Sequence, residues 1–361
     1  MKLFKKLNKS WIKKISKMFS PKTKLMLIFS CLLLALGLIF VWHQSERITE
    51  INNQSIEQVN QPVLGQANPL SGMACQNHQR RPLAVVLASD PVARPLAGLS
   101  QADLVIEMPV ITGSITRMIA FYICQSPEEI GSLRSARHDF VPLALGFDAI
   151  FVHWGGSHFI LDQLDAGIID NIDALKNPYN AFYQKNTIPQ PHNGFTTMER
   201  LLKAAQKLGY RLVNQFEGYG HIQEELNQEQ TSRVLRIGYS YPYNISYQYE
   251  PATNSYLRYR TNLKEIDRNN NQQIEAKNIV VMRVFSKQIE GPYYNDLDLE
   301  GSGLCQIYQN GQVIPCLWQK SEKNPASKLK FLNKDTNKEI PFVVGQTWIE
   351  IVEPNQEVTW E

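Results

Sequence analysis

The sequence predicts an α+β protein with an N-terminal transmembrane helix, followed by a layered β-sheet/helix ectodomain whose C-terminal part is β-rich. Three observations support this fold class. An uncharged apolar run occupies residues 25–42, strand-like and helix-like segments alternate between about residues 80 and 229, and short β segments dominate residues 230–361. A chain of 361 residues of which 43% are hydrophobic can also bury a substantial core.

The first 42 residues predict the membrane topology. Residues 1–24 hold nine lysines and no acidic residue, so we interpret them as a cytoplasmic basic tail. Residues 25–42, LMLIFSCLLLALGLIFVW, would span about 27 Å as a helix, enough to cross the hydrocarbon of a bilayer. Because the lysines precede this run, we expect a single-pass protein of the cell membrane with a cytoplasmic N-terminus and an extracytoplasmic C-terminal domain. A cleaved signal peptide is the alternative.

A polar spacer is expected between the membrane and the folded part. Residues 43–79 are rich in Gln, Asn, Ser and Pro and lack apolar periodicity, so we read them as an extracytoplasmic linker and expect the fold to start near Arg80. In the following part, 80–229, buried strands are predicted at 82–89, 102–110, 116–124 and 148–154, and helices at 135–146, 157–166 and 196–209. The last helix has Thr196 or Thr197 as a capping residue and Glu199 in its first turn.

The C-terminal part, 230–361, reads as a series of short β segments. We expect a hairpin formed by 245–251 and 255–261, a buried strand at 278–285, a cysteine-containing hairpin, and a closing strand pair within 341–353. Residues 267–278 resemble a calcium loop, but Gln272 replaces the turn glycine and Asn278 replaces the bidentate glutamate. A polar turn between two strands is therefore the preferred interpretation.

The cysteines predict two disulfides. Asn310-Gly311 is a type I′ turn signal, and pairing outward from it places Cys305 opposite Cys316, which predicts a cross-strand disulfide. The other two cysteines on the side assigned as oxidising, Cys75 and Cys124, would pair by elimination. Four free thiols are the alternative if the compartment is reducing. The Cys and His spacings do not suggest zinc, and we expect no metal site and no cofactor.

Three arginines lie in or beside apolar segments. Arg117 belongs to the strand at 116–124, and Arg134 and Arg137 belong to the stretch GSLRSARHDF. A charge in such surroundings is costly unless it finds a partner, and the planar guanidinium matches two oxygens of a phosphate or carboxylate. A helix from residue 135 would place Arg134 at a helix start, where backbone amides add to an anion site. Structural pairing of Arg134 and Arg137 with Glu107, Asp139 or Asp148 is the alternative.

Two further segments carry candidate site residues. The glycine turn after the strand at 148–154 and the loop PHNGFT both lie where α/β folds collect ligands. The ligand-binding candidates are therefore Arg117, Arg134, Ser135, Arg137, Gly155, Gly156, Ser157 and Asn193. His153 and His192 could transfer protons, with Glu107 as a carboxylate partner, although lone histidines often have only structural roles. Whether the protein is an enzyme is left open.

Several segments resemble the YerB-like family of bacterial envelope lipoproteins, a domain of unknown function. They are RPLAVVLASDPVARPLAGLSQADLVIE, GSITR, RSAR, DAIFVHWGGS and PHNGFT, in that order, and the similarity continues through KNIVVMRV, GSGLCQIYQNGQVIPCLW and GQTWIEIV, over about residues 80–353. The resemblance implies a β-rich layered α+β fold, with a family N-terminal part at 80–229 and a C-terminal part at 230–361, anchored outside the cytoplasmic membrane. It implies no established reaction. Family members often carry a lipobox cysteine at the end of the apolar run, whereas Cys31 lies in its middle, which favours a retained helix.

The favoured function is binding of an anionic ligand of the cell envelope by an arginine-lined pocket. The ligand would be a cell-wall glycan, a wall polymer or a lipid-linked precursor. One alternative is an envelope enzyme that acts on such a ligand, with His153 or His192 as the acid or base. Another is a scaffold for membrane protein partners. Nucleic acid is not an expected partner, because the chain beyond the lysine tail is net negative and lacks a basic, aromatic-interleaved face.

Overall fold

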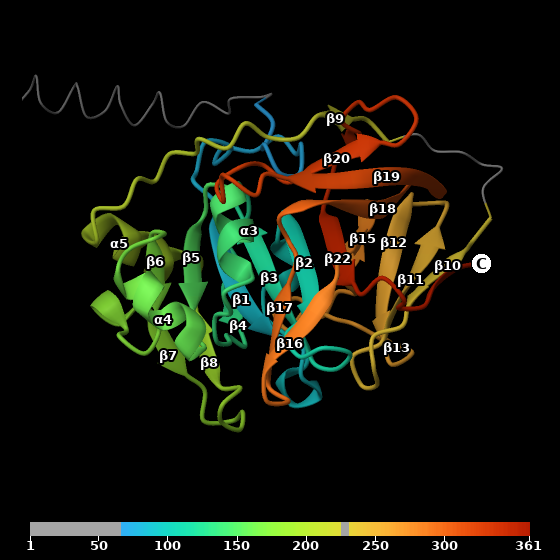
Figure 1. Ribbon diagram of the computed structural model, residues 1–361. Coiled ribbons are helices and arrows are strands. Elements are labelled where there is room, and N and C mark those ends of the chain that lie inside the picture. Colours follow the sequence, from blue (N-terminus) through green and yellow to red (C-terminus); the bar gives the residue numbers. More distant parts are fainter. Residues whose placement is uncertain (1–65, 225–230) are drawn as a thin grey trace, which may run out of the picture. The chain divides into compact units, whose positions relative to one another are not determined.

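The computed structural model describes residues 66–224 and 231–361, which fold around a ten-stranded mixed sheet (Figure 1). Its strands are β1 (Leu83–Ala88), β2 (Leu104–Pro109), β3 (Thr116–Tyr122), β5 (Ile150–His153), β6 (Asn171–Asp173), β15 (Asn278–Arg283), β18 (Gly301–Gln309), β19 (Gln312–Lys320), β20 (Lys330–Asn333) and β22 (Thr347–Val352). They lie in the order β20-β19-β18-β15-β22-β2-β3-β1-β5-β6. Every residue of the central strands β1, β2 and β3 is buried, because both faces of the sheet are covered.

The two halves of the chain share this sheet. β22, from the C-terminal part, pairs in parallel with both β2 and β15, so the strands of the N-terminal part continue directly into those of the C-terminal part. β1 and β5 are parallel, as are β5 and β6, whereas β3 is antiparallel to both β1 and β2. The N-terminal and C-terminal parts therefore share one continuous sheet.

A second, smaller sheet covers one face of the large sheet (Figure 1). Its strands are β10 (Val234–Ile237), β11 (Ile245–Glu250), β12 (Ser255–Arg260), β13 (Leu263–Lys264), β14 (Glu275–Ala276) and β23 (Val358–Trp360). Tyr247 of β11 shares a buried cluster with Val85 and Val105 of the large sheet. α5 (Met198–Lys207) contributes Leu201 to the same cluster, so it covers the same face.

Two helices cover the opposite face. α3 (Phe140–Gly146) and α4 (His158–Asp165) bury Phe140 and Ile160 in a second cluster with Val86 and Ile106. Three small sheets and three short 3-10 helices complete the described residues. They are β16 (Ser286–Glu290) with β17 (Tyr294–Leu297), β9 (His221–Ile222) with β21 (Phe342–Val343), β4 (Ile130–Gly131) with β8 (Gly194–Thr196) and β7 (Phe182–Gln184), and η1 (Pro91–Ala93), η2 (Leu99–Gln101) and η3 (Pro178–Asn180).

Most predicted elements are confirmed. The expected strands correspond to β1, β2, β3, β5 and β15, and the expected hairpin at 245–261 is β11 paired with β12. α4 and α5 lie within the predicted ranges, and the Thr197 side chain caps α5 by accepting a hydrogen bond from the Arg200 amide at 3.2 Å. The turn at Asn310-Gly311 sets Cys305 opposite Cys316, and both predicted disulfides, Cys305–Cys316 and Cys75–Cys124, are present.

The predicted helix at 135–146 begins five residues later than expected. Residues 133–136 run extended because nonlocal partners take their backbone groups. The Leu133 amide donates to the Gly194 carbonyl, the Arg134 amide to the Val86 carbonyl and the Ala136 amide to the Gly155 carbonyl. The prediction that Arg134 stands at a helix start is therefore wrong, since α3 starts at Phe140.

Two other expectations need correction. The closing segments β21 and β22 do not pair with each other, because β21 pairs with β9 and β22 lies between β15 and β2. The fold also starts before Arg80. Leu70 is fully buried, and the Asn68 side chain donates to Asp103 Oδ1 at 2.5 Å, so the end of the predicted spacer belongs to the core.

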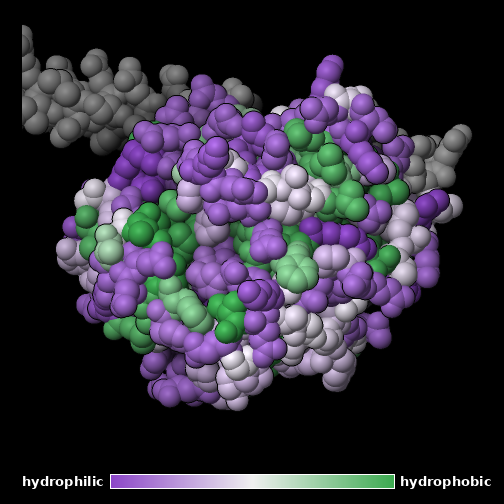
Figure 2. Space-filling view, viewed as in Figure 1, coloured by the Kyte–Doolittle hydropathy of each residue, from purple (hydrophilic) through white to green (hydrophobic). Residues whose placement is uncertain are grey.

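The membrane predictions lie outside the described residues. The basic tail 1–24, the predicted helix 25–42, Cys31 and residues 43–65 are in this category. Of residues 66–224 and 231–361, none belongs to a helix long and apolar enough to cross a membrane. Polar residues cover most of the face in Figure 2, interrupted by small groups of hydrophobic residues.

Candidate functional site

The candidate site lies where the parallel strands β1 and β5 end. Asp90 follows β1, the turn Trp154–Ser157 follows β5, and Arg117 is the second residue of β3, directly opposite Ala88 at the end of β1. In Figure 1 this is the lower end of the sheet, next to β4 and β8. Ligands in open α/β sheets commonly bind outside the carboxyl ends of the parallel strands.

Backbone hydrogen bonds bring the predicted site segments together. The Ala136 amide donates to the Gly155 carbonyl at 2.9 Å, and the Ser157 amide donates to the Ala136 carbonyl at 3.1 Å. The Leu133 amide reaches the Gly194 carbonyl at 2.9 Å. Residues 133–137 therefore lie against both the glycine turn and the loop that holds His192 and Asn193.

Glycine is required in the turn after β5. Gly155 has φ of +63°, and a Cβ atom at this position would lie 2.7 Å from Leu175 Cδ1. Next to it, Ser157 precedes α4, and its buried hydroxyl has no hydrogen-bond partner among the described residues. The turn thus presents a buried polar group beside the Ala136 backbone.

Arg117, Arg134 and Arg137, which we call the arginine cluster, have few protein partners. Arg117 is 4% exposed and donates from Nη1 to the Ser135 carbonyl at 2.8 Å. Arg137 donates from Nη1 to the Ala136 carbonyl at 3.0 Å, and its guanidinium lies 5.4 Å from the centre of the Tyr294 ring. The Nε atoms of all three arginines are buried without a hydrogen-bond partner among the described residues.

A single carboxylate approaches the arginine cluster. Within the described part of the chain, Asp90 is the one acidic residue within 4 Å of a cluster guanidinium, with its Oδ2 atom 3.8 Å from Arg134 Nε. The side chains of Arg134 and Asp90 are 19% and 17% exposed, so the cluster opens to solvent on this side. Three cations against one acid leave an excess of positive charge at the strand ends.

The arginines also act on one another. Burial lowers the pKa of Arg117 well below its ordinary value, and the positive charges of Arg137 and Arg134 lower it further. Burial likewise lowers the pKa of Arg137, with a contribution from Arg134 that the Tyr294 ring hydroxyl opposes. Because guanidinium groups stay charged in proteins, these shifts mean that the three cations repel one another in partly dry surroundings. A bound anion would relieve that repulsion.

The structural alternative for the arginines required other acidic partners, and these are engaged elsewhere. Asp148 accepts hydrogen bonds from Arg211 and lies 3.7 Å from Arg81 Nε. Asp139 Oδ1 accepts from the Leu297 amide at 3.1 Å, and burial raises the pKa of this carboxyl to about 7. Neither carboxylate lies within 4 Å of Arg134 or Arg137, so the expected bridges are not formed.

Asp90 and Tyr243 belong to the site but were missed in the sequence. The Tyr243 hydroxyl donates to Asp90 Oδ1 at 3.2 Å and comes from the C-terminal part of the chain. His192 Nδ1 lies 3.9 Å from Asp90 Oδ2. Burial lowers the pKa of His192, Arg134 lowers it further and Asp90 opposes the shift, so the imidazole is mainly neutral at pH 7. Asp90 could have been noticed as an acid directly after a buried strand.

His153 is not open to a ligand. Its ring is fully buried, with Nδ1 at 2.8 Å from the Gly155 carbonyl and Nε2 at 3.2 Å from Asn171 Oδ1. Both ring nitrogens are therefore occupied by the protein, and the histidine supports the glycine turn. The prediction of His153 as an acid or base is not supported by this geometry, whereas His192 stays beside the arginine cluster.

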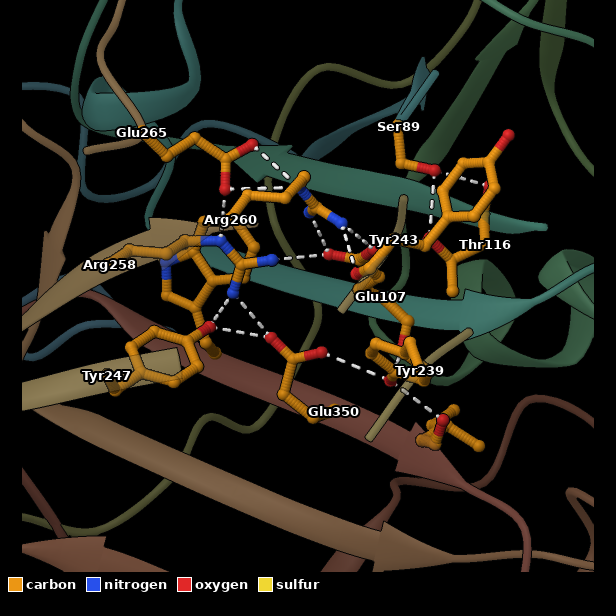
Figure 3. Close-up of polar contacts among 12 residues, drawn as sticks. Ser89, Glu107, Thr116, Tyr239, Tyr243, Tyr247, Arg258, Arg260, Glu265 and Glu350 are labelled. Atoms are coloured by element: carbon orange, nitrogen blue, oxygen red, sulfur yellow. Dashed lines mark hydrogen bonds and ion pairs between the residues drawn. The ribbon is translucent and has the colours of Figure 1, made fainter. Parts of the chain in front are cut away.

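Glu107 lies on the other face of the large sheet. Met108 pairs with Arg117, so Glu107, one residue earlier in β2, points away from the arginine cluster. Its carboxylate instead accepts hydrogen bonds from Arg260 at 2.6 and 2.9 Å and from Arg258 (Figure 3). The prediction of Glu107 as a partner of the site histidines is therefore wrong.

Arg258 is the centre of this buried ionic network, which joins the two sheets. Its guanidinium, fully buried, contacts the carboxylates of Glu107, Glu265 at 2.7 Å and Glu350 at 2.6 Å (Figure 3). Burial would raise the pKa of Glu265, but Arg260 and Arg258 lower it to about 2. Burial raises the pKa of Glu350 to about 8, because only Arg258 lies directly against it.

The charges in the network then balance at neutral pH. Burial acts to raise the pKa of Glu107 as well, but both arginines lower it below its ordinary value, so Glu350 is the carboxyl that holds the proton. Arg258 and Arg260 were missed in the sequence, although two arginines at alternate positions of one strand share a face. This network joins the two sheets, and the side chains at its centre, Arg258, Glu107 and Glu350, are fully buried.

Comparisons with known proteins identify the family. Residues 70–211 match the family model described as "Protein of unknown function (DUF3048) N-terminal domain", and residues 235–349 match the corresponding C-terminal domain. One relative is "Putative lipoprotein YerB" of Bacillus subtilis (strain 168), which is 32% identical over 289 residues, 79% of this chain and 85% of the relative. The crystal structure of YerB from Bacillus subtilis matches with a TM-score of 0.73, covering 82% of this chain and 100% of that chain.

Proposed function

The chain belongs to the DUF3048 family, and from this premise we propose that it is a membrane-anchored extracytoplasmic protein that binds an anionic ligand of the cell envelope. The ligand would be a cell-wall glycan, a wall polymer or a lipid-linked precursor. The arginine cluster would hold its phosphate or carboxylate groups. The turn at Gly155–Ser157 and Asn193 would line the same site.

Two observations support the extracytoplasmic location. The relative from Bacillus subtilis carries the word lipoprotein in its name, and the two disulfides fit an oxidising compartment. We propose that residues 25–42 form a retained membrane helix rather than a lipidated anchor, because Cys31 stands in the middle of the apolar run. This anchor would hold the binding site close to the outer surface of the cytoplasmic membrane.

The observation that carries the proposal is the charge imbalance at the strand ends. Burial lowers the pKa values of Arg117 and Arg137 and neighbouring guanidinium groups lower them further, while Asp90 is the one carboxylate within 4 Å among the described residues. In a purely structural network each buried arginine would be paired with a carboxylate. Arg258 and Arg260, for example, pair with three glutamates. Unsatisfied Nε atoms beside a solvent opening are typical of a site that an external anion completes.

Binding to purified cell-wall sacculi tests the proposal. The full-length chain, solubilised in mild detergent, is sedimented with sacculi over a salt series, and wild type is compared with Arg134→Ala/Arg137→Ala. A control variant, Arg233→Ala/Arg236→Ala, removes the same charge from two exposed positions outside the site. We expect salt-sensitive binding that is lost in the cluster variant and kept in the control. Equal binding of all three proteins would contradict a role of the arginine cluster.

An enzyme acting on the same ligand is a second candidate, because His192 stands beside the cluster. Its mainly neutral ring, 3.9 Å from Asp90, could accept a proton from a bound group. A catalytic His192 would make His192→Ala lose turnover while keeping affinity for sacculi. If His192→Ala changes only the affinity for sacculi, the histidine contributes to binding and not to catalysis.

A further inference from the structure

A second polar cluster begins at His138, four residues after Arg134 and directly after Arg137 in the chain. His138, Asp139 and Asp296 place their ligand-type atoms within 4.8 Å of one another. His138 Nε2 lies 3.4 Å from Asp139 Oδ1 and 3.0 Å from Asp296 Oδ1. One imidazole nitrogen therefore faces two carboxylate oxygens that come from distant parts of the chain.

The fold holds these three residues in fixed positions. His138 and Asp139 form the turn that precedes α3, and Asp296 belongs to β17. The Leu297 amide, next to Asp296, donates to Asp139 Oδ1 at 3.1 Å and ties β17 to the start of the helix. The geometry of the cluster is thus set by backbone contacts rather than by the side chains alone.

An unpartnered buried oxygen points to a missing ligand. The Asp139 side chain is 2% exposed, and its Oδ2 atom has no hydrogen-bond partner among the described residues. A buried carboxylate oxygen without a partner is costly, because it has lost its hydration and gained nothing in exchange. A metal ion bound beside this carboxylate would satisfy it.

The surroundings are strongly acidic. The cluster lines a cavity of about 780 Å³, and Asp298, Glu300 and Glu322 are also among its lining residues. The one guanidinium in its lining is Arg283, whose Nη1 is already bonded to the carbonyls of Glu353, Pro354 and Gln356. Five acidic residues therefore line this cavity together with a single arginine that is already hydrogen-bonded, which favours cations over anions there.

We propose that His138, Asp139 and Asp296 bind a divalent transition-metal cation at the edge of this cavity. One imidazole nitrogen and two carboxylate oxygens form a mixed N/O donor set that suits Zn²⁺, Mn²⁺ or Fe²⁺ better than Ca²⁺ or Mg²⁺. Metal–ligand bonds of about 2.0–2.1 Å place neighbouring donors about 2.8–3.4 Å apart in octahedral or tetrahedral sites. The two distances from His138 Nε2, 3.4 and 3.0 Å, fall in this range.

This cation site departs from the sequence-based expectation of no metal, and it does not depend on the proposed anion site. No short motif predicts the whole site, because His138 and Asp296 lie 158 residues apart. Only the pair His138 and Asp139, which are neighbours in the chain, forms a local pattern that points to the site.

Mn²⁺ binding tests the site directly. The tag-free full-length chain in detergent, stripped with EDTA and dialysed, is titrated with Mn²⁺ while the free ion is followed by electron paramagnetic resonance. We expect one bound Mn²⁺ per chain, displaced by Zn²⁺, and binding at least about tenfold weaker in Asp296→Asn and in His138→Ala. Asp296 is half exposed, so its variant should fold normally. Near-ultraviolet circular dichroism checks this.

Asp298→Asn is the matched control. Asp298 is exposed, lines the same cavity and loses the same charge on substitution, but it lies outside the cluster. We expect its Mn²⁺ affinity to stay within about twofold of wild type. No binding by wild type up to millimolar Mn²⁺, unchanged binding in both cluster variants, or an equal loss in Asp298→Asn would each overturn the proposal.

Discussion

Asp90 Oδ2 lies 3.8 Å from Arg134 Nε and 3.9 Å from His192 Nδ1, so one carboxylate faces both a cluster arginine and the site histidine. Its other oxygen accepts a hydrogen bond from Tyr243 of the C-terminal part. Asp90 thus occupies the position from which it partly neutralises the arginine cluster. An incoming anion would compete with it for Arg134.

Replacing Asp90 should therefore strengthen anion binding. Asp90→Asn keeps the shape and can still accept from Tyr243, but it removes the competing charge. We expect affinity for sacculi to rise by about threefold to tenfold at low salt, with the gain fading as salt increases. Co-sedimentation over a salt series measures this. A loss of affinity would mean that Asp90 itself contacts the ligand.

Removing the charge of Arg258 and removing the charge of Arg117 should affect the stability of the protein differently. Arg258→Met leaves three buried glutamates around an apolar side chain, so we expect the free energy of unfolding to fall by about 3–5 kcal/mol. Arg117→Met removes a cation that has no carboxylate partner within 4 Å in the described residues, and we expect stability to stay the same or rise by about 1 kcal/mol. Urea unfolding of the full-length chain distinguishes the two. A large loss in Arg117→Met would make this arginine structural.

The pKa of Glu350 predicts a pH-dependent stability. Its value in the folded protein is about 8, above the ordinary value for glutamate, so between roughly pH 4.5 and 8 the folded state holds one more proton than the unfolded state. The free energy of unfolding should therefore fall as pH rises through this window. Glu350→Gln cannot titrate, so its stability relative to wild type should increase by about 4 kcal/mol from pH 5 to pH 9.

Comparing the two proteins in urea at each pH cancels the contributions of other groups, such as Asp139 with a pKa of about 7 and Lys320 with a pKa of about 8. A constant difference between wild type and Glu350→Gln at all pH values would show that Glu350 is not the residue that holds the proton.

The two disulfides should contribute unequally to stability. Cys75–Cys124 joins residues 49 positions apart, whereas Cys305–Cys316 spans 11 positions within one hairpin. Loop-closure entropy then gives about 4 kcal/mol for the first bridge and about 3 kcal/mol for the second. We expect Cys75→Ala/Cys124→Ala to lower the urea midpoint more than Cys305→Ala/Cys316→Ala. The opposite order would indicate that the segment around Cys75 is held by its other contacts, such as Leu70.

The strands and the cysteine hairpin could be predicted because their signals are local. The run LAVVLA is buried on both faces and forms β1, and Asn310-Gly311 fixes the hairpin register without any knowledge of the rest of the fold. The course of residues 133–137 could not be predicted in this way. Their backbone partners, Val86, Gly155 and Gly194, are distant in sequence, and these bonds outweigh the local preference for helix.

The difference between local and long-range signals also explains which site residues were predicted correctly and which were not. The segments of Arg117, Arg134, Gly155 and Asn193 meet as expected, because glycine turns and polar loops at strand ends gather at one edge of a sheet. The prediction of Glu107 as a partner of the site histidines failed, since the pairing register of β2 decides which alternate residues face the arginines. This register depends on the pairing of β2 with β3 and β22, which no local sequence pattern defines.

The most direct test of the anion site needs no knowledge of the natural ligand. The free energy of unfolding of the full-length chain is measured in increasing phosphate, with chloride keeping the ionic strength constant. Phosphate stabilises many proteins nonspecifically, and Arg233→Ala/Arg236→Ala reports that general effect. Stabilisation by a bound anion should grow with the logarithm of its concentration above the dissociation constant.

We predict that wild type and the Arg233→Ala/Arg236→Ala control gain stability in parallel, whereas Arg134→Ala/Arg137→Ala gains clearly less. This result would show that phosphate binds at the arginine cluster. Equal gains in all three proteins would contradict the central claim that Arg117, Arg134 and Arg137 form an anion site.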